Sequence, residues 1–263
     1  MKKLIVSDKN KLIKEINKLK LKKEREKLGK FYVEGERIID EIPQSIKIHQ
    51  YVFSNKFYEQ IENKEKYNRA NHIVIDENIF KKISDTKNPQ GIMAICSIPK
   101  SNINNIKIDK NSFFVILDRV CEPGNMGTII RTAEALGANG IFLSKGCVDL
   151  YNDKVIRATM GSIFHIPIVS DCDVASLINY FKDNNVDVVC TYLEGGKAPY
   201  NIDFNKATSI IIGNEANGVL EEYKNMATNL VKIPMVGNVE SMNASISSGI
   251  IFYEVLSQRL KNN

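Results

Sequence analysis

From residue 112 onward, short apolar segments alternate with stretches that have the spacing of amphipathic helices. Six of these segments have the length and composition of buried β-strands: FFVILD, GIFLS, HIPIV, VDVVCTYL, TSIII and NLVKIPM. Strands that alternate with helices pair in parallel, and helices then cover both faces of the sheet. The alternation therefore predicts a doubly wound α/β domain over residues 112–263, whose final helix covers roughly residues 241–259.

The first 98 residues show a shorter version of this alternation. Ser7 is a candidate cap for a helix over roughly residues 8–28, and Gly29 stands where that helix should stop. Strand-like segments separated by polar helices follow: IHQYVFS, HIVI and GIMAICSI. Residues 99–111 are polar, have no period and contain Pro, Ser and Asn, as linkers do. We therefore expect a small N-terminal α/β domain over residues 1–98 and a linker over residues 99–111.

The basic residues are concentrated at the N-terminus. Residues 1–30 hold twelve Lys and Arg against four Asp and Glu, a net charge of +8. The other 233 residues hold 24 against 27, a net charge of −3. A local basic patch is the electrostatic footprint of a phosphate-backbone partner, although Lys-rich segments also form plain solvated helix faces.

Several classes of protein are disfavoured by the sequence. It has no run of eighteen apolar residues, so we expect no membrane span, and its first apolar run is too short for a signal peptide. We therefore expect a cytoplasmic protein. The five cysteines are far apart and the three histidines are scattered, so we expect neither a disulfide nor a metal. The cysteines are Cys96, Cys121, Cys147, Cys172 and Cys190.

Three polar, glycine-spaced loops follow three of the predicted strands. The first is LDRVCEPGNMGTIIRTAEALGA, with Asn125 and Arg131; the second is IIIGNEANGV, with Glu215; the third is IPMVGNVESMNAS, with Ser241 and Asn243. Ligands bind beyond the carboxyl ends of strands in open α/β sheets, so the loops are candidates for one composite pocket. Taken singly, each loop is also compatible with plain structure: turn glycines, a surface ion pair or a capped helix start.

In this order and spacing, the loops resemble the three motifs of the SpoU (TrmH-like) family of RNA ribose 2′-O-methyltransferases, in the SPOUT superfamily. Residues 118–137 are similar to D-x-x-x-x-P-x-N-x-G-x-x-x-R-T-A-x-A-x-G, residues 213–218 to G-x-E-x-x-G, and residues 233–245 to I-P-M-x-G-x-x-E-S-x-N-x-S. Upstream, FYVEGERIIDE and NPQGIMAI resemble the family's small N-terminal substrate-binding domain. Departures are small, such as Ala216 where Gly is common and Met242 where Leu is common.

The resemblance implies a fold and a cofactor. The C-terminal domain would be a parallel-sheet SPOUT domain with a deep trefoil knot, a rare topology that periodicity alone cannot reveal. The protein would be a homodimer with its final helix at the interface. The cofactor would be S-adenosyl-L-methionine, held mainly by backbone atoms of Gly213, Ile233 and Met242, with Thr191 as a further contact.

The same resemblance implies a mechanism. A methyl group moves from the cofactor to a ribose 2′-hydroxyl, and no metal is needed. Arg131 would handle the hydroxyl, either as the general base that the family proposal names or as a ligand of phosphate and the developing alkoxide, because a neutral guanidine is rare. Asn125 and Asn243 would position ribose or phosphate, and Glu215 and Ser241 would orient Arg131 and the loops.

The implied partner is RNA. Large-subunit (23S) ribosomal RNA is the first choice, because the N-terminal domain resembles those of rRNA-modifying members, and transfer RNA is the alternative. A non-catalytic RNA-binding or ribosome-associated protein that retains the fold is the remaining rival, and intact Arg131, Glu215 and Asn243 argue against it. The candidate phosphate ligands are Lys3, Lys11, Lys14, Lys22, Lys23 and Arg25.

Overall fold

The computed structural model describes residues 4–261, and the chain divides into two compact units. The first unit comprises Met1–Lys100 together with Tyr151–Phe164, and the second comprises Ser101–Leu150 together with His165–Asn263. Residues 151–164, which the sequence pattern places in the C-terminal domain, therefore fold with the first unit. Within residues 4–261, no helix has the length and apolar character needed to cross a membrane.

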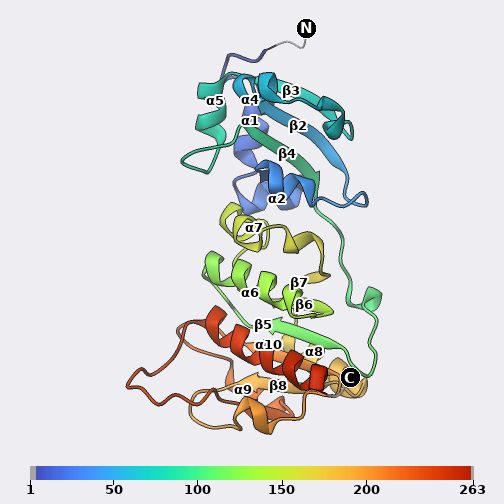
Figure 1. Cartoon of the computed structure of the whole chain (residues 1–263), viewed down its shortest axis with the longest axis vertical. Helices are drawn as coiled ribbons and strands as arrows, with labels where there is room; N and C mark the ends of the chain where they lie inside the picture. Colours follow the sequence, from blue (N-terminus) through green and yellow to red (C-terminus); the bar gives the residue numbers. More distant parts are fainter. Residues whose placement is uncertain (1–3, 262–263) are drawn as a thin grey trace. The chain divides into compact units, whose positions relative to one another are not determined.

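The first unit is an α/β fold, as predicted, built on a mixed four-stranded sheet (Figure 1). Its strands are β1 (Lys30–Glu34), β2 (Ile48–Ser54), β3 (Asn71–Ile75) and β4 (Ile92–Ser97). Its helices are α1 (Lys11–Lys18), α2 (Lys22–Leu28), α3 (Glu36–Asp40), α4 (Asn55–Gln60), α5 (Glu77–Ile83) and the 3-10 turn η1 (Lys64–Tyr67). The sheet order is β1-β4-β2-β3; β1 and β2 run antiparallel to β4, and β3 runs parallel to β2.

The basic N-terminal segment forms two short helices, not the single helix predicted for residues 8–28. α1 begins after Asn10, whose side chain accepts from a backbone amide of the first turn at 2.9 Å. α2 ends at Gly29 in the left-handed conformation expected of a helix stop. The chain breaks between them because the Leu19 carbonyl accepts from Arg25 Nη1 at 2.6 Å instead of from a helical amide.

This contact removes Arg25 from the candidate phosphate ligands. Arg25 is 5% exposed, and its guanidinium holds the turn between α1 and α2. The prediction that it binds RNA is therefore wrong, because a buried side chain cannot reach a phosphate. Lys3 lies outside the described residues. The remaining candidates are exposed: Lys11, Lys14, Lys22 and Lys23.

Residues 151–164 pack on the sheet of the first unit through aromatic rings. The ring centroid of Phe31, on β1, lies 4.6 Å from that of Tyr151 and 6.4 Å from that of Phe164. The sequence pattern predicts one helix here. The structure has instead a short helix and a separate 3-10 turn, because two residues with positive φ interrupt the segment. They are α7 (Asp153–Thr159) and η3 (Ser162–Phe164).

The second unit contains the six parallel strands that the alternation predicts (Figure 1). The strands are β5 (Phe113–Leu117), β6 (Gly140–Ser144), β7 (Ile168–Cys172), β8 (Asp187–Thr191), β9 (Thr208–Ile212) and β10 (Asn229–Val231). The helices are α6 (Pro123–Ala135), α8 (Val174–Asp183), α9 (Glu221–Met226) and α10 (Ala244–Lys261), with turns η2 (Ile103–Asn105) and η4 (Pro199–Asn201). The order is β10-β8-β9-β5-β6-β7, and each neighbouring pair is parallel. The carboxyl ends of the strands, where the three polar loops begin, therefore share one edge.

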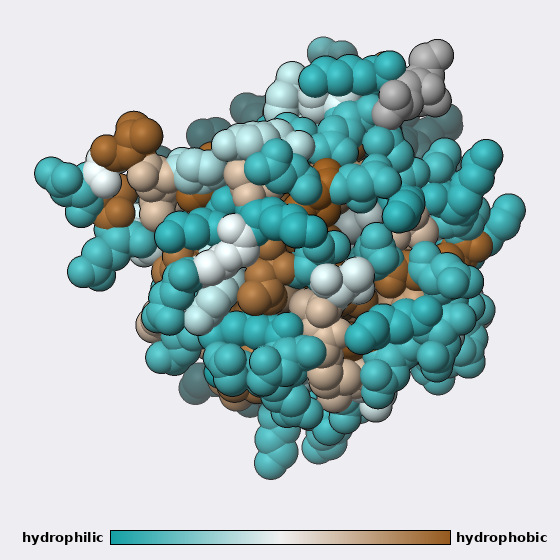
Figure 2. Space-filling model, turned by 90° about the horizontal axis from the view of Figure 1, so that it is seen from below, coloured by the Kyte–Doolittle hydropathy of each residue, from teal (hydrophilic) through white to brown (hydrophobic). Residues whose placement is uncertain are grey.

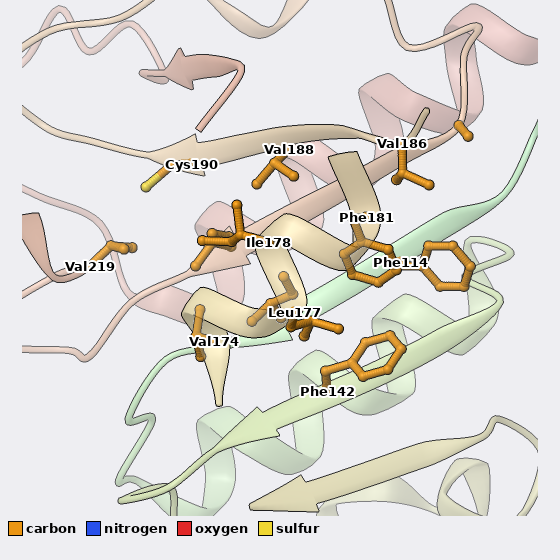
Figure 3. Close-up of a cluster of buried hydrophobic side chains, with 13 residues drawn as sticks. Phe114, Phe142, Val174, Leu177, Ile178, Phe181, Val186, Val188, Cys190 and Val219 are labelled. Atoms are coloured by element: carbon orange, nitrogen blue, oxygen red, sulfur yellow. The ribbon is translucent and has the colours of Figure 1, made fainter. Parts of the chain in front are cut away.

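Helices cover both faces of this sheet. Side chains of β5 alternate between the faces: Phe114 stacks on Phe181 of α8 with ring centroids 5.0 Å apart, whereas Phe113 meets Phe252 of α10 at 5.3 Å. Figure 3 shows the first of these cores, where side chains of α8 such as Ile178 and Phe181 gather with strand side chains such as Phe114. α6 packs beside α10 on the other face.

α10 returns from the edge strand β10 to the middle of the sheet, and one arginine anchors its far end. Arg259 donates from all three guanidinium nitrogens to four carbonyls of neighbouring loops. This anchor places the start of α10 beside α6 and the polar loops. The deep trefoil knot that the resemblance implies stays a prediction. The four acceptors are Asn111, Ser112, Phe204 and Lys206.

Candidate active site

A cavity of about 1030 Å³ lies in the second unit where the three polar loops meet. Its lining comes mainly from the segments that follow β5, β8, β9 and β10, the edge at which such sheets bind ligands. Arg131 is not part of that lining. The other eight residues predicted to bind the cofactor or to act in catalysis line the cavity: Asn125, Thr191, Gly213, Glu215, Ile233, Ser241, Met242 and Asn243.

One chain of hydrogen bonds joins the three loops. Asn243 Nδ2 donates to Asn125 Oδ1 at 2.9 Å, and Asn125 Nδ2 donates to Glu215 Oε1 at 3.1 Å. Asn125 is only 8% exposed, so its amide needs both partners. The three loops therefore belong to one site, which the sequence could only suggest from their places at strand ends.

Glu215 acts in this geometry as an anchor and stays ionised. Its Oε1 also accepts from the Glu122 amide at 3.0 Å, and its Oε2 accepts from the Cys121 amide at 3.2 Å, next to the start of α6. Burial opposes ionisation, but the hydrogen bonds from the Asn125 side chain and these amides outweigh it and lower the pKa of Glu215. A carboxylate with these partners is better suited to holding the loops than to accepting a substrate proton.

Asn243 has two roles at the start of α10. Its Oδ1 accepts from the Ser245 amide at 2.8 Å and the Ile246 amide at 3.3 Å, which caps the helix, while its Nδ2 reaches Asn125. The helix consequently begins at Ala244, three residues later than predicted. The polar residues of the third loop thus serve both as a helix cap and as a wall of the cavity.

The rest of the third loop is held differently. Among the described residues, no hydrogen bond or ion pair involves residues 233–242. This segment forms the projection at the left of Figures 1 and 2, which carries exposed hydrophobic side chains, including Val236 and Val239. The backbone groups of Ile233 and Met242, which line the cavity, are therefore available to a ligand.

The other two predicted cofactor residues have clear structural constraints. A Cβ on Gly213 would lie 2.3 Å from the Gly218 carbonyl carbon and from the Val219 amide nitrogen, so only glycine fits there. The Thr191 hydroxyl donates to the Ile211 carbonyl at 2.9 Å, which ties the end of β8 to β9. Gly213 thus allows close backbone approach, and Thr191 supports the strand ends.

Arg131 stands apart from the other predicted catalytic residues. It lies on α6 six residues after Asn125, which at 100° per residue places it about 120° away around the helix. It is exposed, and its side chain has no hydrogen bond or ion pair with the described part of the chain. Among the described residues, neither Glu215 nor Ser241 has a hydrogen bond or ion pair with the Arg131 side chain, so their role in orienting it stays a prediction.

The cavity also contains residues that the sequence analysis missed. Tyr192 and Glu194 follow Thr191 at the end of β8, where the strand-end rule that located the other loops applies equally. Lys224 lies with its Nζ 4.3 Å from the Tyr192 ring centroid, a contact without any local sequence signal. Within residues 4–261, no group of three or more His, Cys, Asp or Glu side chains could hold a metal ion.

Family models match both parts of the chain. The model described as the SpoU rRNA Methylase family matches residues 112–253, and that of the MRM3-like substrate binding domain matches residues 10–94. The 23S rRNA (guanosine(2553)-2′-O)-methyltransferase RlmP of Bacillus subtilis (strain 168) is 32% identical over 257 residues, 96% of this chain and 99% of that protein.

Solved structures agree with these matches over nearly the whole chain. The AdoMet-bound rRNA methyltransferase from Sinorhizobium meliloti has a TM-score of 0.87 and 33% identity, covering 96% of this chain and 97% of that one. The SpoU methyltransferase AviRb from Streptomyces viridochromogenes, in complex with AdoMet, has a TM-score of 0.86 and 25% identity, covering 96% and 99%.

Replacing Glu215 by Gln tests the anchor. The new NH₂ group would face an N–H donor, and leaving a donor unpaired destabilises a fold by about 1–3 kcal/mol. We expect Glu215→Gln to lower the free energy of unfolding by that amount at pH 7, measured by chemical denaturation. Glu194→Gln is the control: Glu194 is an exposed cavity residue whose carboxylate accepts from the Tyr192 hydroxyl, and the variant should stay within about 0.5 kcal/mol of the wild type.

The comparison of wild type with Glu215→Gln also predicts how stability changes with pH. Because the pKa of Glu215 is lowered from its ordinary value of 4.5, its stabilisation is present above pH 4.5 and is lost as the pH falls through the lowered value. The difference in free energy of unfolding between wild type and Glu215→Gln should therefore become smaller below pH 4.5. A difference that stays constant at low pH would contradict the anchor role.

Proposed function

Because this chain belongs to the SpoU rRNA methylase family, we propose that it transfers a methyl group from S-adenosyl-L-methionine to a ribose 2′-hydroxyl of 23S ribosomal RNA. One observation carries the proposal: the Asn243–Asn125–Glu215 hydrogen-bond chain joins the three family loops around a single cavity. The Bacillus subtilis relative, named for 2′-O-methylation of a 23S rRNA guanosine, supports the choice of substrate. A cytoplasmic location belongs to the same proposal.

The cavity suits an adenosyl cofactor. Its volume of about 1030 Å³ stands at the upper end of the range of about 300–1,000 Å³ for ligand pockets, which leaves room for part of a substrate as well. The unbonded backbone of Ile233 and Met242 would hold the cofactor through main-chain groups, and Gly213 allows close approach. When bound, S-adenosyl-L-methionine supplies a methyl group on an electrophilic sulfonium.

The contribution of the chain is to align the ribose oxygen with that methyl group. Asn125 Nδ2 has a second hydrogen beyond the one given to Glu215, and it can donate to a ribose oxygen. Asn243 and Glu215 hold the amide in one orientation, so this donor is in place before the substrate arrives. Alignment of reacting groups contributes roughly 7–11 kcal/mol in favourable cases.

Arg131 enters the site from a second copy of the chain in this proposal. It is exposed on α6, and the next residue, Thr132, packs against α10, where a Cβ on Gly249 would lie 3.7 Å from Thr132 Cγ2. An apolar groove of about 520 Å³ runs beside α10. Exposed apolar patches mark interaction sites, and a two-fold dimer across α10 would cover this one. The groove is lined in part by Tyr200, Ile246, Ile250 and Tyr253.

A charge in the groove should dissociate the dimer. Tyr253 is 62% exposed in the single chain, so Tyr253→Glu is compatible with the fold but would bury a carboxylate in the dimer. Light scattering should show the wild type at twice the monomer mass and Tyr253→Glu at the monomer mass. Leu21→Glu is the matched control, because Leu21 is also 62% exposed but lies in the first unit. A monomeric wild type, or a dimeric Tyr253→Glu protein, would contradict the interface.

The exposed lysines of α1 and α2 bind RNA phosphates in this proposal. Each phosphate neutralised on single-stranded nucleic acid adds about 0.7 to the slope of log K against log salt. Replacing Lys11, Lys14, Lys22 and Lys23 by Gln should therefore make the slope shallower by about 3, measured by RNA binding across salt concentrations. The control replaces four exposed lysines elsewhere in the chain. An equal change of slope in the control would mean that the basic segment is an ordinary solvated surface without a specific role in RNA binding. The control lysines are Lys82, Lys87, Lys100 and Lys107.

Arg131 would bind the phosphate next to the target ribose and stabilise the developing alkoxide. Arginine is the side chain that proteins use to bind phosphate and to stabilise developing negative charge, which suits this role better than that of a general base. Removing one preorganised donor of this kind lowers turnover on the order of 100- to 1,000-fold. Arg131→Ala should therefore lose methylation while its cofactor affinity, set by the cavity of the same chain, stays at the wild-type value.

Nucleoside mass spectrometry tests the substrate and Arg131 together. Ribosomal and transfer RNA would be compared from cells with and without the gene, and from cells rescued with wild type or Arg131→Ala. We expect one 2′-O-methylnucleoside to disappear from 23S rRNA and to return with the wild type alone. If the methylnucleoside is lost from transfer RNA instead, transfer RNA is the substrate and the proposed reaction still holds. No change in either RNA would favour the non-catalytic RNA-binding protein.

A further inference from the structure

A second polar network, outside the predicted catalytic set, is built on an ion pair between adjacent residues. Asp118, directly after β5, is 1% exposed although it is a carboxylic acid. Its Oδ1 accepts from Arg119 Nε at 3.0 Å, and its Oδ2 accepts from Arg119 Nη2 at 2.9 Å. A buried carboxylate is costly unless it is paired and hydrogen-bonded, so this bidentate contact allows Asp118 to stay buried.

Asp118 and Arg119 hold the second loop of the cavity on both sides: their paired side chains hold the side that leaves the loop, and the Arg119 backbone carbonyl holds the side that enters it. Where the chain leaves the loop, the Leu220 amide donates to Asp118 Oδ2 at 3.2 Å, and the Gly218 carbonyl accepts from Arg119 Nη2 at 3.2 Å. Where the chain enters the loop, Asn214 Nδ2 donates to the backbone carbonyl of Arg119 at 2.8 Å. The loop that carries the predicted cofactor glycine is therefore tied at both ends to two residues of the first loop.

The backbone of Arg119 is unusual as well. Its φ is 56°, in the left-handed region that residues other than glycine rarely adopt. Its amide donates to Ser144 Oγ at 2.9 Å, and its side chain packs beside Gly146, where a Cβ would lie 3.3 Å from Arg119 Cγ. Strained residues persist where their surroundings fix them, and they cluster at functional sites. Arg119 is fixed by two strand ends and by the second loop at once.

We propose that Asp118 and Arg119 are positioning residues, whose ion pair sets the shape of the loop over residues 213–220 and thereby the affinity of the cavity for its adenosyl cofactor. The inference rests on the proposed function. Neither side chain lines the cavity, so both act through the loop and neither is a catalytic residue. Weakening the pair should raise the dissociation constant of the cofactor and leave turnover at saturating cofactor unchanged.

The first test is Arg119→Lys, because lysine keeps the charge but lacks the planar fork that contacts the carboxylate twice. Calorimetric titration with S-adenosylhomocysteine should show about tenfold weaker binding. RNA methylation at saturating S-adenosyl-L-methionine should keep kcat within about twofold of the wild type. Arg157→Lys is the matched control: Arg157 forms an ion pair of 2.6 Å with Asp153 on α7, outside the cavity, and its replacement should change neither value.

A second variant separates the ion pair from the backbone strain. Arg119→Gly relieves the strain, because glycine adopts a φ of 56° readily, but it removes the guanidinium. We expect it to bind the cofactor at least as weakly as Arg119→Lys. Wild-type affinity in either variant would overturn the inference. So would a loss of kcat at unchanged affinity, which would make Arg119 a catalytic residue.

Two further outcomes are distinguishable. If the variants weaken RNA binding and leave cofactor binding unchanged, Arg119 is a phosphate ligand and the positioning role is overturned. If the proposed function itself fails, the wild-type protein will show no cofactor binding or no methylation of any RNA, before a variant is compared. Thermal melting by circular dichroism, run on each variant and on Arg157→Lys, confirms that affinities are compared between folded proteins.

Discussion

The side-chain amide of Asn125 connects the three loops on which the cavity is built. An amide has distinct donor and acceptor ends, and burial leaves both in need of partners. Asn243 supplies the donor and Glu215 the acceptor, so each loop must reach one position to satisfy the amide. Glu215 also accepts from two backbone amides at the start of α6, the helix that carries Asn125. The shape of the cavity therefore depends on this one buried group.

The walls of the cavity differ in how firmly they are held. Side-chain contacts cross-link the first two loops, whereas residues 233–242 form no hydrogen bond with the described part of the chain. An unbonded backbone is tolerated on a surface because water satisfies its N–H and C=O groups, and these groups stay available to a ligand. A fixed wall facing open backbone groups can bind a polar cofactor without first breaking internal hydrogen bonds, which preserves affinity.

The sheet and the place of the cavity follow from local sequence pattern, because apolar runs such as FFVIL and TSIII are buried strands and polar loops follow them. The features that pattern did not predict depend on contacts between residues far apart in the chain or on one side-chain bond. The N-terminal helix is split because Arg25 reaches the Leu19 carbonyl. Residues 151–164 fold with the first unit because their aromatic rings meet Phe31. α10 starts late because the Asn243 side chain turns back to cap it.

Arg131 shows most clearly what motif spacing leaves open. The motif places it six residues after Asn125, but the turn of a helix puts the two residues on different sides of α6. A motif records which residues serve one function, and not whether a single copy of the chain brings them together. Four predicted catalytic residues share one cavity in this chain, whereas the fifth is exposed on α6, the helix that packs beside α10. If Arg131 acts across a dimer, as we propose, turnover depends on assembly: a lone chain would hold the cofactor among its three loops, and the charge that handles the hydroxyl would arrive only with a second copy.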